Sequence, residues 1–474
     1  MIRQTFNLML AQVVGRLTGF LILLLMGNML GSTRMGAYGT MLTMLMLATI
    51  VSTFGIDLWL TRHVANHPVC KKEFLQINCL KWGITLLTFV LYAFAFQADW
   101  LGSELKPFTA SLVLVLGALF FDHVALTVQS ILEGNRDLNA IAKLILMRWF
   151  VFALLGVASL IYWNNLLAFC ASFMLASLAR CVLGLYLVRP CLTSSESESA
   201  FVITDIFRFA APMALLNTMV GLYFHIDMLM IPKLDSLEGA GFYKVAYTMV
   251  EALLFISGAF ASSLFPLFSK KEVSFQTKWE QFSKGSYLLL LIAFPISFCT
   301  PLVSTWMIEL FFLKAERALE FLPAASALNL LVWALPAMFI NASLVRLFLG
   351  LHWQKAALGG VSLTVLTNII LNLNLIPKMG FLGAAVSTVV SEWVLCLFLM
   401  VFLLYRGKKI SVWTPFMKPL LASLLCYPMA FFIAQWSVPL SIPITAVGYA
   451  LFLRGTRLLT AADWKQFGVL DTRH

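Results

Sequence analysis

Apolar residues occur in long runs along this chain, and short polar or Gly- and Pro-containing breaks separate the runs. A helix that crosses a bilayer needs about 20 mostly apolar residues, and the runs reach that length. None of the breaks is long enough to fold as a separate water-soluble domain, which usually needs at least about 50 residues. The pattern predicts fourteen membrane-spanning helices, at about 6–30, 38–60, 77–97, 108–132, 143–163, 166–188, 206–231, 243–268, 286–311, 323–347, 356–376, 381–404, 415–435 and 438–454.

The composition agrees with this pattern. Of the 474 residues, 61% are hydrophobic and 12% are charged, and the charged share is about half that of a soluble domain. The first run is too long for a cleavable signal peptide, so it is expected to stay as the first helix. We predict an all-α polytopic membrane protein. An enzyme with a catalytic head outside the membrane is not expected.

The basic residues predict the orientation. When the loops are assigned alternately to two sides, 24 Lys and Arg residues fall on the side of the N-terminus and 7 on the other. Basic residues collect on the cytoplasmic side of inner-membrane proteins. Both termini are therefore predicted to lie in the cytoplasm, and topology explains the net charge of +11 without nucleic-acid binding.

Two short motifs recur along the chain. Residues 31–38 and 235–243 each enter a span through Gly-x-Tyr, about 205 residues apart, and residues 132–136 and 349–353 each end a span. Short Gly-containing loops also resemble one another by chance. A true repeat predicts two parallel six-helix bundles that rock about a central site, as in transporters. The predicted divisions are a first bundle at 1–200, a second at 201–405, and two extra helices with a cytoplasmic tail at 406–474.

Several motifs together resemble one family. They are Leu30-Gly31 followed by Gly36-Ala-Tyr38, Phe54-Gly55, Asp227-Met-Leu-Met-Ile231 followed by Gly241-Phe-Tyr243, and the run from Asn368 through Pro377 and Gly383 to Thr388. The chain resembles the polysaccharide transporters, including Wzx-type O-antigen flippases, of the multidrug/oligosaccharidyl-lipid/polysaccharide exporter superfamily. The resemblance implies a flippase that moves an undecaprenyl-diphosphate-linked oligosaccharide across the inner membrane by alternating access.

Ionisable side chains inside the predicted spans are the main candidates for function, because each costs at least about 2.5–3.5 kcal/mol near the bilayer centre. Arg16 and Arg180 are candidate ligands of a diphosphate, which a guanidinium binds in a bidentate manner. Ion pairs with Asp122 are the structural alternative. Asp122, Asp227 and Glu251 are candidates for carrying a coupling proton or sodium ion.

Two amides complete the candidate site. Asn368 and Asn372 are four residues apart and share one helix face, so they are expected to hydrogen-bond a sugar or, more often, a neighbouring helix. No cofactor and no metal site is predicted. His63 and His67 stand at i,i+4 spacing but lack the further ligands that a metal site needs.

Three other functions remain open. A multidrug antiporter of the same superfamily shares the twelve-helix core, although a cationic drug would prefer an acidic cavity. A peptidoglycan-precursor flippase has the same number of spans. A membrane polysaccharide polymerase would carry a large outer loop, whereas the longest outer loops here have an ordinary length. The expected partners are membrane lipids, the lipid-linked glycan, and a polysaccharide polymerase or ligase.

Overall fold

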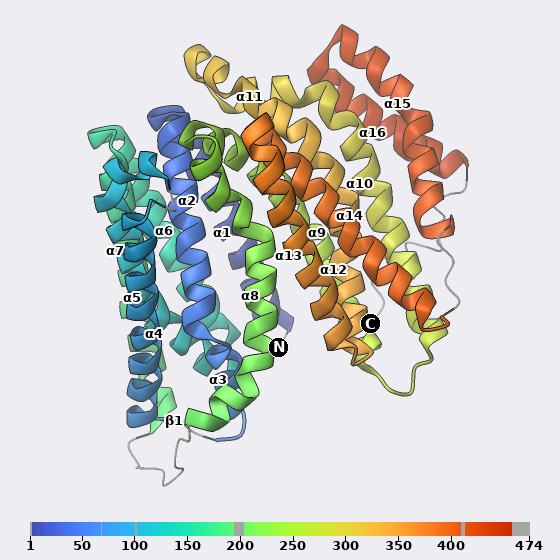
Figure 1. Cartoon of the computed structure of the whole chain (residues 1–474). Coiled ribbons are helices and arrows are strands. Elements are labelled where there is room, and N and C mark those ends of the chain that lie inside the picture. The colour runs from blue at the N-terminus through green and yellow to red at the C-terminus, as the bar shows by residue number, and fades with distance from the viewer. Residues whose placement is uncertain (1, 68, 100–101, 194–202, 409–412, 457–474) are drawn as a thin grey trace. The chain divides into compact units, whose positions relative to one another are not determined.

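The computed structural model describes residues 2–67, 69–99, 102–193, 203–408 and 413–456, and long helices dominate it (Figure 1). The elements of the first part are α1 (Ile2–Leu30), α2 (Ser32–Thr53), α3 (Ile56–Val64), β1 (Val69–Cys70), α4 (Lys71–Gln97), η1 (Ser103–Phe108), α5 (Thr109–Gly134), α6 (Leu138–Trp163), α7 (Leu166–Val188), η2 (Arg189–Cys191) and β2 (Leu192–Thr193).

The later elements are α8 (Ile203–Leu234), α9 (Leu237–Ser269), α10 (Phe275–Phe311), α11 (Ala315–Leu331), η3 (Val332–Ala334), α12 (Leu335–Gly350), α13 (Gln354–Met379), α14 (Phe381–Tyr405), the π-helical η4 (Trp413–Met417), α15 (Lys418–Trp436) and α16 (Val438–Gly455). The cytoplasmic tail predicted after these helices lies outside the described residues.

The prediction of an all-α membrane protein is confirmed. Within the described residues, thirteen helical stretches are long and apolar enough to cross a membrane. Each of them coincides with a predicted span, and α8 covers the remaining one at 206–231. The predicted span 38–60 is interrupted, because Phe54 and Gly55 both take left-handed backbone conformations and separate α2 from α3. The strands β1 and β2 form only a two-residue parallel bridge.

The chain divides into two compact units. The first comprises residues 1–248, 312–321 and 365–387, and the second comprises 249–311, 322–364 and 388–474. This division by compactness differs from the division into bundles at 1–200 and 201–405, which stays a prediction. Buried aliphatic side chains such as Leu60, Val128 and Leu144 make up one core cluster in the first unit.

The two turns singled out as a repeat adopt the same hydrogen-bonded geometry. After α5, Arg136 has φ of 60° and the N–H of Asp137 donates to the carbonyl of Leu132 at 2.9 Å. After α12, His352 has φ of 59° and the N–H of Trp353 donates to the carbonyl of Phe348, also at 2.9 Å. This is the Schellman arrangement, in which the left-handed position favours glycine.

Replacing Arg136 by glycine is expected to stabilise the protein by about 1 kcal/mol relative to Arg136→Ala, because only glycine adopts the left-handed conformation without strain. Arg136 is exposed, so both variants lose the same charge and little packing. The measurement is thermal unfolding of the purified protein in detergent. Equal unfolding temperatures for the two variants would contradict the assigned turn geometry.

The other repeated motif brings its two copies into direct contact. Within the first unit, a Cβ added to Gly36 of α2 would lie 1.8 Å from the carbonyl oxygen of Leu237. A Cβ added to Gly241 of α9 would lie 2.2 Å from the carbonyl oxygen of Ser32. Ser32 and Leu237 are 205 residues apart, as are Gly36 and Gly241. The first turns of α2 and α9 therefore cross with reciprocal, nearly two-fold contacts between their backbones.

Candidate functional site

A buried polar cluster in the first unit is built around Asp227 of α8. The hydroxyl of Tyr243 on α9 donates to Asp227 Oδ2 at 2.6 Å, and Asn372 Nδ2 on α13 donates to Asp227 Oδ1 at 2.6 Å. Asn372 Nδ2 also donates to Asn368 Oδ1 at 2.9 Å. All four side chains belong to residues that are at most 2% exposed. We call these four residues the aspartate cluster.

The aspartate cluster joins residues that the sequence had assigned to different tasks. Asn368 and Asn372 were candidates for sugar binding, and Asp227 was a candidate for ion coupling. As predicted, the i,i+4 spacing of Asn368 and Asn372 places both amides on one face of α13. This face meets the carboxylate of Asp227 on α8. Asn372 Oδ1 is buried and has no hydrogen-bond partner. Carboxylate and amide oxygens of this kind are the ligands that hard cations such as sodium take.

Asp122 lies between two arginines in the N-terminal part of the same unit. Its Oδ1 is 3.5 Å from Arg180 Nη1, and its Oδ2 is 3.5 Å from Arg148 Nη2. Arg180 Nη2 donates to Gln129 Oε1 at 2.8 Å, and Ser177 Oγ donates to Asp122 Oδ2 at 3.3 Å. Arg180 is 6% exposed. These contacts favour the ion pair, the alternative that the sequence left open, over a substrate-binding role for Arg180.

The same contacts disfavour Asp122 as a cation carrier, because two adjacent guanidinium groups repel a second cation. Arg148 lies near the start of the predicted span 143–163, and a long basic side chain at such a position is expected to reach the interface. In the structure its guanidinium instead lies 4.9 Å from the centre of the Phe173 ring and faces Asp122.

Sequence reasoning also missed a buried lysine. Lys81 of α4 is one of the 24 basic residues that the loop count assigned to the side of the N-terminus. It is instead fully buried and forms an ion pair with Asp57 at the start of α3. Its ammonium group also donates to Thr127 Oγ1 of α5 at 2.9 Å. The sequence did indicate that this lysine is buried, since Lys81 falls inside the predicted span 77–97. A lysine that deep in a span requires a buried partner.

Arg16 is exposed, unlike Arg180, and the packing of α1 fixes its direction. Gly15 and Gly19 are covered by Trp149 of α6, so that an added Cβ would lie 2.4 Å and 2.6 Å from its ring. Phe6, Leu10 and Leu17 lie on the side of α1 opposite to this contact, and Arg16 lies on the flank between the two. The exposed residues of α1 then form two faces, an apolar one (Phe6, Leu10, Leu17 and Leu21) and a more polar one (Thr5, Met9, Gln12 and Arg16).

Glu251, the third candidate for ion coupling, lies in the second unit. It is exposed on α9, whereas Asp227 is 2% exposed. The two carboxylates therefore differ in surroundings, and the structure does not bring Glu251 into the aspartate cluster.

His63 lies in the last turn of α3, and His67 follows the helix; their rings stack with centres 5.1 Å apart. His63 also stacks on Trp59 at 4.7 Å. Burial lowers the pKa of His63 below its ordinary value, and the nearby His67 adds to this, while Glu73 acts in the opposite direction. In the described part of the chain, no three His, Cys, Asp or Glu side chains are grouped so that they could hold a metal ion.

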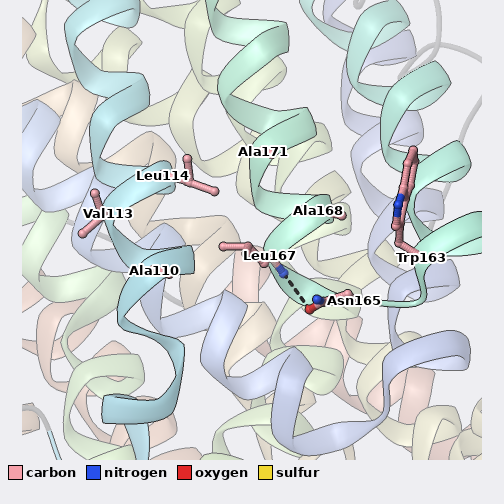
Figure 2. Close-up of a pocket in the computed structure, with 8 residues that line it drawn as sticks. All are labelled: Ala110, Val113, Leu114, Trp163, Asn165, Leu167, Ala168 and Ala171. Atoms are coloured by element: carbon pink, nitrogen blue, oxygen red, sulfur yellow. Dashed lines mark hydrogen bonds between the residues drawn. The ribbon is translucent and has the colours of Figure 1, made fainter.

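A recess of about 710 Å³ opens between the start of α5 and the α6–α7 turn (Figure 2). Alanine, valine and leucine side chains line most of it, with Trp163 at one side. Its one polar side chain is that of Asn165, whose Oδ1 accepts a hydrogen bond from the N–H of Leu167 at 3.1 Å, as Figure 2 shows. With no charged side chain in its lining, this recess has no groups for catalysis or for binding a phosphate.

The family model described as "Polysaccharide biosynthesis protein" matches residues 1–272, which are more than half of the chain. The chain belongs to this polysaccharide biosynthesis protein family. One relative of this chain is an uncharacterized membrane protein of Methanocaldococcus jannaschii, which is 20% identical over 415 residues; the match covers 81% of this chain and 80% of the relative.

Two solved structures share the fold of this chain. One is the lipid II flippase MurJ in an inward closed conformation, with a TM-score of 0.78 and 13% identity over 94% of this chain and 97% of MurJ. The other is a multidrug resistance MATE family transporter of the MOP superfamily in an inward-facing conformation, with a TM-score of 0.64 and 14% identity over 83% of this chain and 98% of the transporter. The chain therefore shares the polytopic helical fold of these two proteins.

Proposed function

We propose that the protein flips an undecaprenyl-diphosphate-linked oligosaccharide across the cytoplasmic membrane by alternating access, driven by an ion gradient. The observation that carries this proposal is the polar exposed face of α1 with Arg16, in a chain whose family is named for polysaccharide biosynthesis. A guanidinium on an accessible helix face binds phosphate oxygens through two parallel hydrogen bonds. The buried Arg180 is assigned a structural role beside Asp122.

An apolar cavity in the second unit suits the lipid part of such a substrate. It has a volume of about 500 Å³ and is lined mainly by α9, α10, α15 and α16, including Leu291, Ile296, Tyr427 and Ile442. Burial of an isoprenoid chain in such a cavity is favourable, at roughly 25 cal/mol per Å² of apolar surface. The helices α15 and α16 lie beyond the twelve-helix core, so they give the chain a surface that a drug antiporter with that core alone would lack.

We assign the coupling ion to the aspartate cluster rather than to Asp122 or Glu251. Asp227 combines deep burial with neutral hydrogen-bond donors, and Asn372 Oδ1 lies beside it with no hydrogen-bond partner. Entry of a sodium ion or a proton would compensate the buried carboxylate. The glycan itself is a surface polysaccharide unit, delivered to a polymerase or ligase on the other side of the membrane.

Depletion of the protein tests the proposed substrate. In cells that lack it, lipid-linked oligosaccharide is expected to accumulate in the cytoplasmic leaflet, where an impermeant glycan-modifying reagent does not reach it. Normal exposure of the glycan together with raised retention of a cationic dye would instead identify the drug antiporter. Accumulation of unflipped lipid II would identify the peptidoglycan-precursor flippase.

Arg16→Ala is expected to reduce flipping at least 10-fold, because the loss of a bidentate charge-assisted contact to phosphate costs about 1.5–3 kcal/mol. Arg16→Lys should retain part of the activity, since it keeps the charge but loses the planar fork. Flipping in reconstituted vesicles measures both variants. Arg3→Ala, which removes an exposed arginine nearer the start of the same helix, is the matched control. Wild-type flipping by Arg16→Ala would refute a ligand role.

A further inference from the structure

The first turns of α2 and α9 present backbone N–H groups that need acceptors, as at every helix N-terminus. At α2 the preceding residue is Gly31, which has no side chain to provide one. Its φ of 86° suits glycine, and an added Cβ would lie 2.6 Å from Arg317 Nη1. At α9, Ser236 Oγ accepts from the N–H of Gly239 at 3.0 Å. Each helix also has an acceptor from a distant part of the chain.

Glu320 of α11 provides the acceptor for α2. Its Oε1 accepts from both the N–H and the Oγ of Ser32, each at 2.6 Å, across 288 residues of sequence. Arg317 forms an ion pair with Glu320 Oε2, and its Nη2 donates to the carbonyl of Met29 at 3.4 Å. A carboxylate at this position also interacts favourably with the positive end of the helix dipole.

Glu104 of η1 provides the acceptor for α9. Its Oε2 accepts from the N–H of Leu237 at 2.7 Å, across 133 residues. Gly102 positions this short helix, because its φ of 89° lets the backbone approach the carbonyl oxygen of Pro232. An added Cβ at Gly102 would lie only 2.7 Å from that oxygen.

The two caps are related in the same way as the repeated motifs. The capped residues, Ser32 and Leu237, are 205 residues apart and flank the crossing of Gly36 with Gly241. The capping residues, Glu104 and Glu320, are 216 residues apart, the same spacing that separates the two repeated turns at Arg136 and His352. Each predicted bundle thus caps the second helix of the other.

We propose that Glu104 and Glu320 form a reciprocal outer lock, which holds the two predicted bundles together on the side assigned as outer and opens once in each transport cycle. This proposal rests on alternating access as proposed above. Removal of one carboxylate cap typically changes a helix equilibrium about 5-fold. The two capped helix starts touch, and Ser32 Oγ also lies 3.5 Å from Glu238 Oε1 of α9. The double variant should therefore exceed either single variant, without a simple product of the two effects.

The experiment measures the lock without any glycan. Spin labels are attached at Arg34 of α2 and Leu319 of α11, both exposed, in a background with the native cysteines replaced by serine. Pulsed electron–electron double resonance gives the distance distribution in nanodiscs. Wild-type protein is expected to show mainly the short, closed distance. Glu104→Ala and Glu320→Ala should each raise the long-distance population, and the double variant should raise it most.

Two controls separate a lock from a merely structural contact. Glu316→Ala removes an exposed glutamate from the first turn of α11, one turn before Glu320, and should leave the distribution unchanged. Glu320→Gln keeps an acceptor oxygen and should fall between wild type and Glu320→Ala. A double variant that is folded by size exclusion and circular dichroism but keeps the wild-type distribution would overturn the lock. This outcome would leave the proposed substrate intact. Conversely, if depletion caused no accumulation of lipid-linked oligosaccharide, the substrate proposal would fail, but the distances measured for the lock would still stand.

Discussion

Gly36→Ala and Gly241→Ala are expected to abolish flipping and to lower the unfolding temperature markedly. A methyl group at Gly36 would lie 1.8 Å from the carbonyl oxygen of Leu237, and one at Gly241 would lie 2.2 Å from that of Ser32. Both of these oxygens belong to the backbone, so the clash cannot be relieved by rotation of a side chain. The added methyl group would therefore force α2 away from α9. Overpacking of this kind costs about 1–3 kcal/mol, and occasionally more.

Gly83→Ala is the matched control for these two variants. Gly83 lies within α4, and an added Cβ would have no neighbour within 4 Å. Alanine there should stabilise the helix by about 0.5–1 kcal/mol. The measurements are thermal unfolding in detergent and flipping in reconstituted vesicles. Normal unfolding and flipping by Gly36→Ala would show that the two helix starts do not touch in the working protein.

Asp227→Asn is expected to abolish ion-driven flipping, a loss of at least about 100-fold. Both oxygens of Asp227 accept hydrogen bonds, one from Tyr243 and one from Asn372. An asparagine places an NH₂ group against one of these donors, and a buried donor without an acceptor costs about 1–3 kcal/mol. The variant also removes the negative charge that would attract the coupling ion.

Vesicles with imposed pH or sodium gradients measure this effect and identify the ion. Glu251→Gln, which neutralises an exposed carboxylate of α9, should keep most of the gradient response. Tyr243→Phe removes one donor to Asp227 but leaves the charge. Because that donor stabilises the ionised carboxylate, the variant should bind the compensating ion more tightly without abolishing transport. Wild-type flipping that responds to neither gradient would refute ion coupling, and an unchanged response in Asp227→Asn would place the ion elsewhere.

The sequence predicted the helices well because membrane spans are specified by length and apolarity alone. Each predicted span coincides with helical structure, and most errors are at the ends, as with α2, which begins at Ser32 rather than near residue 38. The exception is the break at Phe54 and Gly55 inside the span predicted at 38–60. The repeat was visible as Gly-x-Tyr recurring at 205 residues. The contact between the two copies of the repeat could not be predicted. Spacing along a sequence does not reveal that Gly36 and Gly241 both lie where α2 crosses α9.

The candidate site was harder to predict, because pairing between helices depends on how each helix is rotated about its axis. The sequence identified Asp227, Asn368 and Asn372 separately, and only the structure joins Asn372 to Asp227 at 2.6 Å. Arg148 was assigned to the interface because a basic residue near the end of a span commonly reaches water, and Lys81 was counted with the loops on the side of the N-terminus. Both instead face carboxylates inside the first unit.

The hydrogen bond between Ser32 and Glu320 also has a consequence for biosynthesis. The two residues are 288 positions apart, and a ribosome that adds about 5–20 residues per second needs about 15–60 s to synthesise that length. During this interval α2 has been made, but its acceptor has not. The nascent N-terminal helices therefore wait in the membrane with exposed polar groups, a period in which an insertase or membrane chaperone that shields them would raise the yield of folded protein.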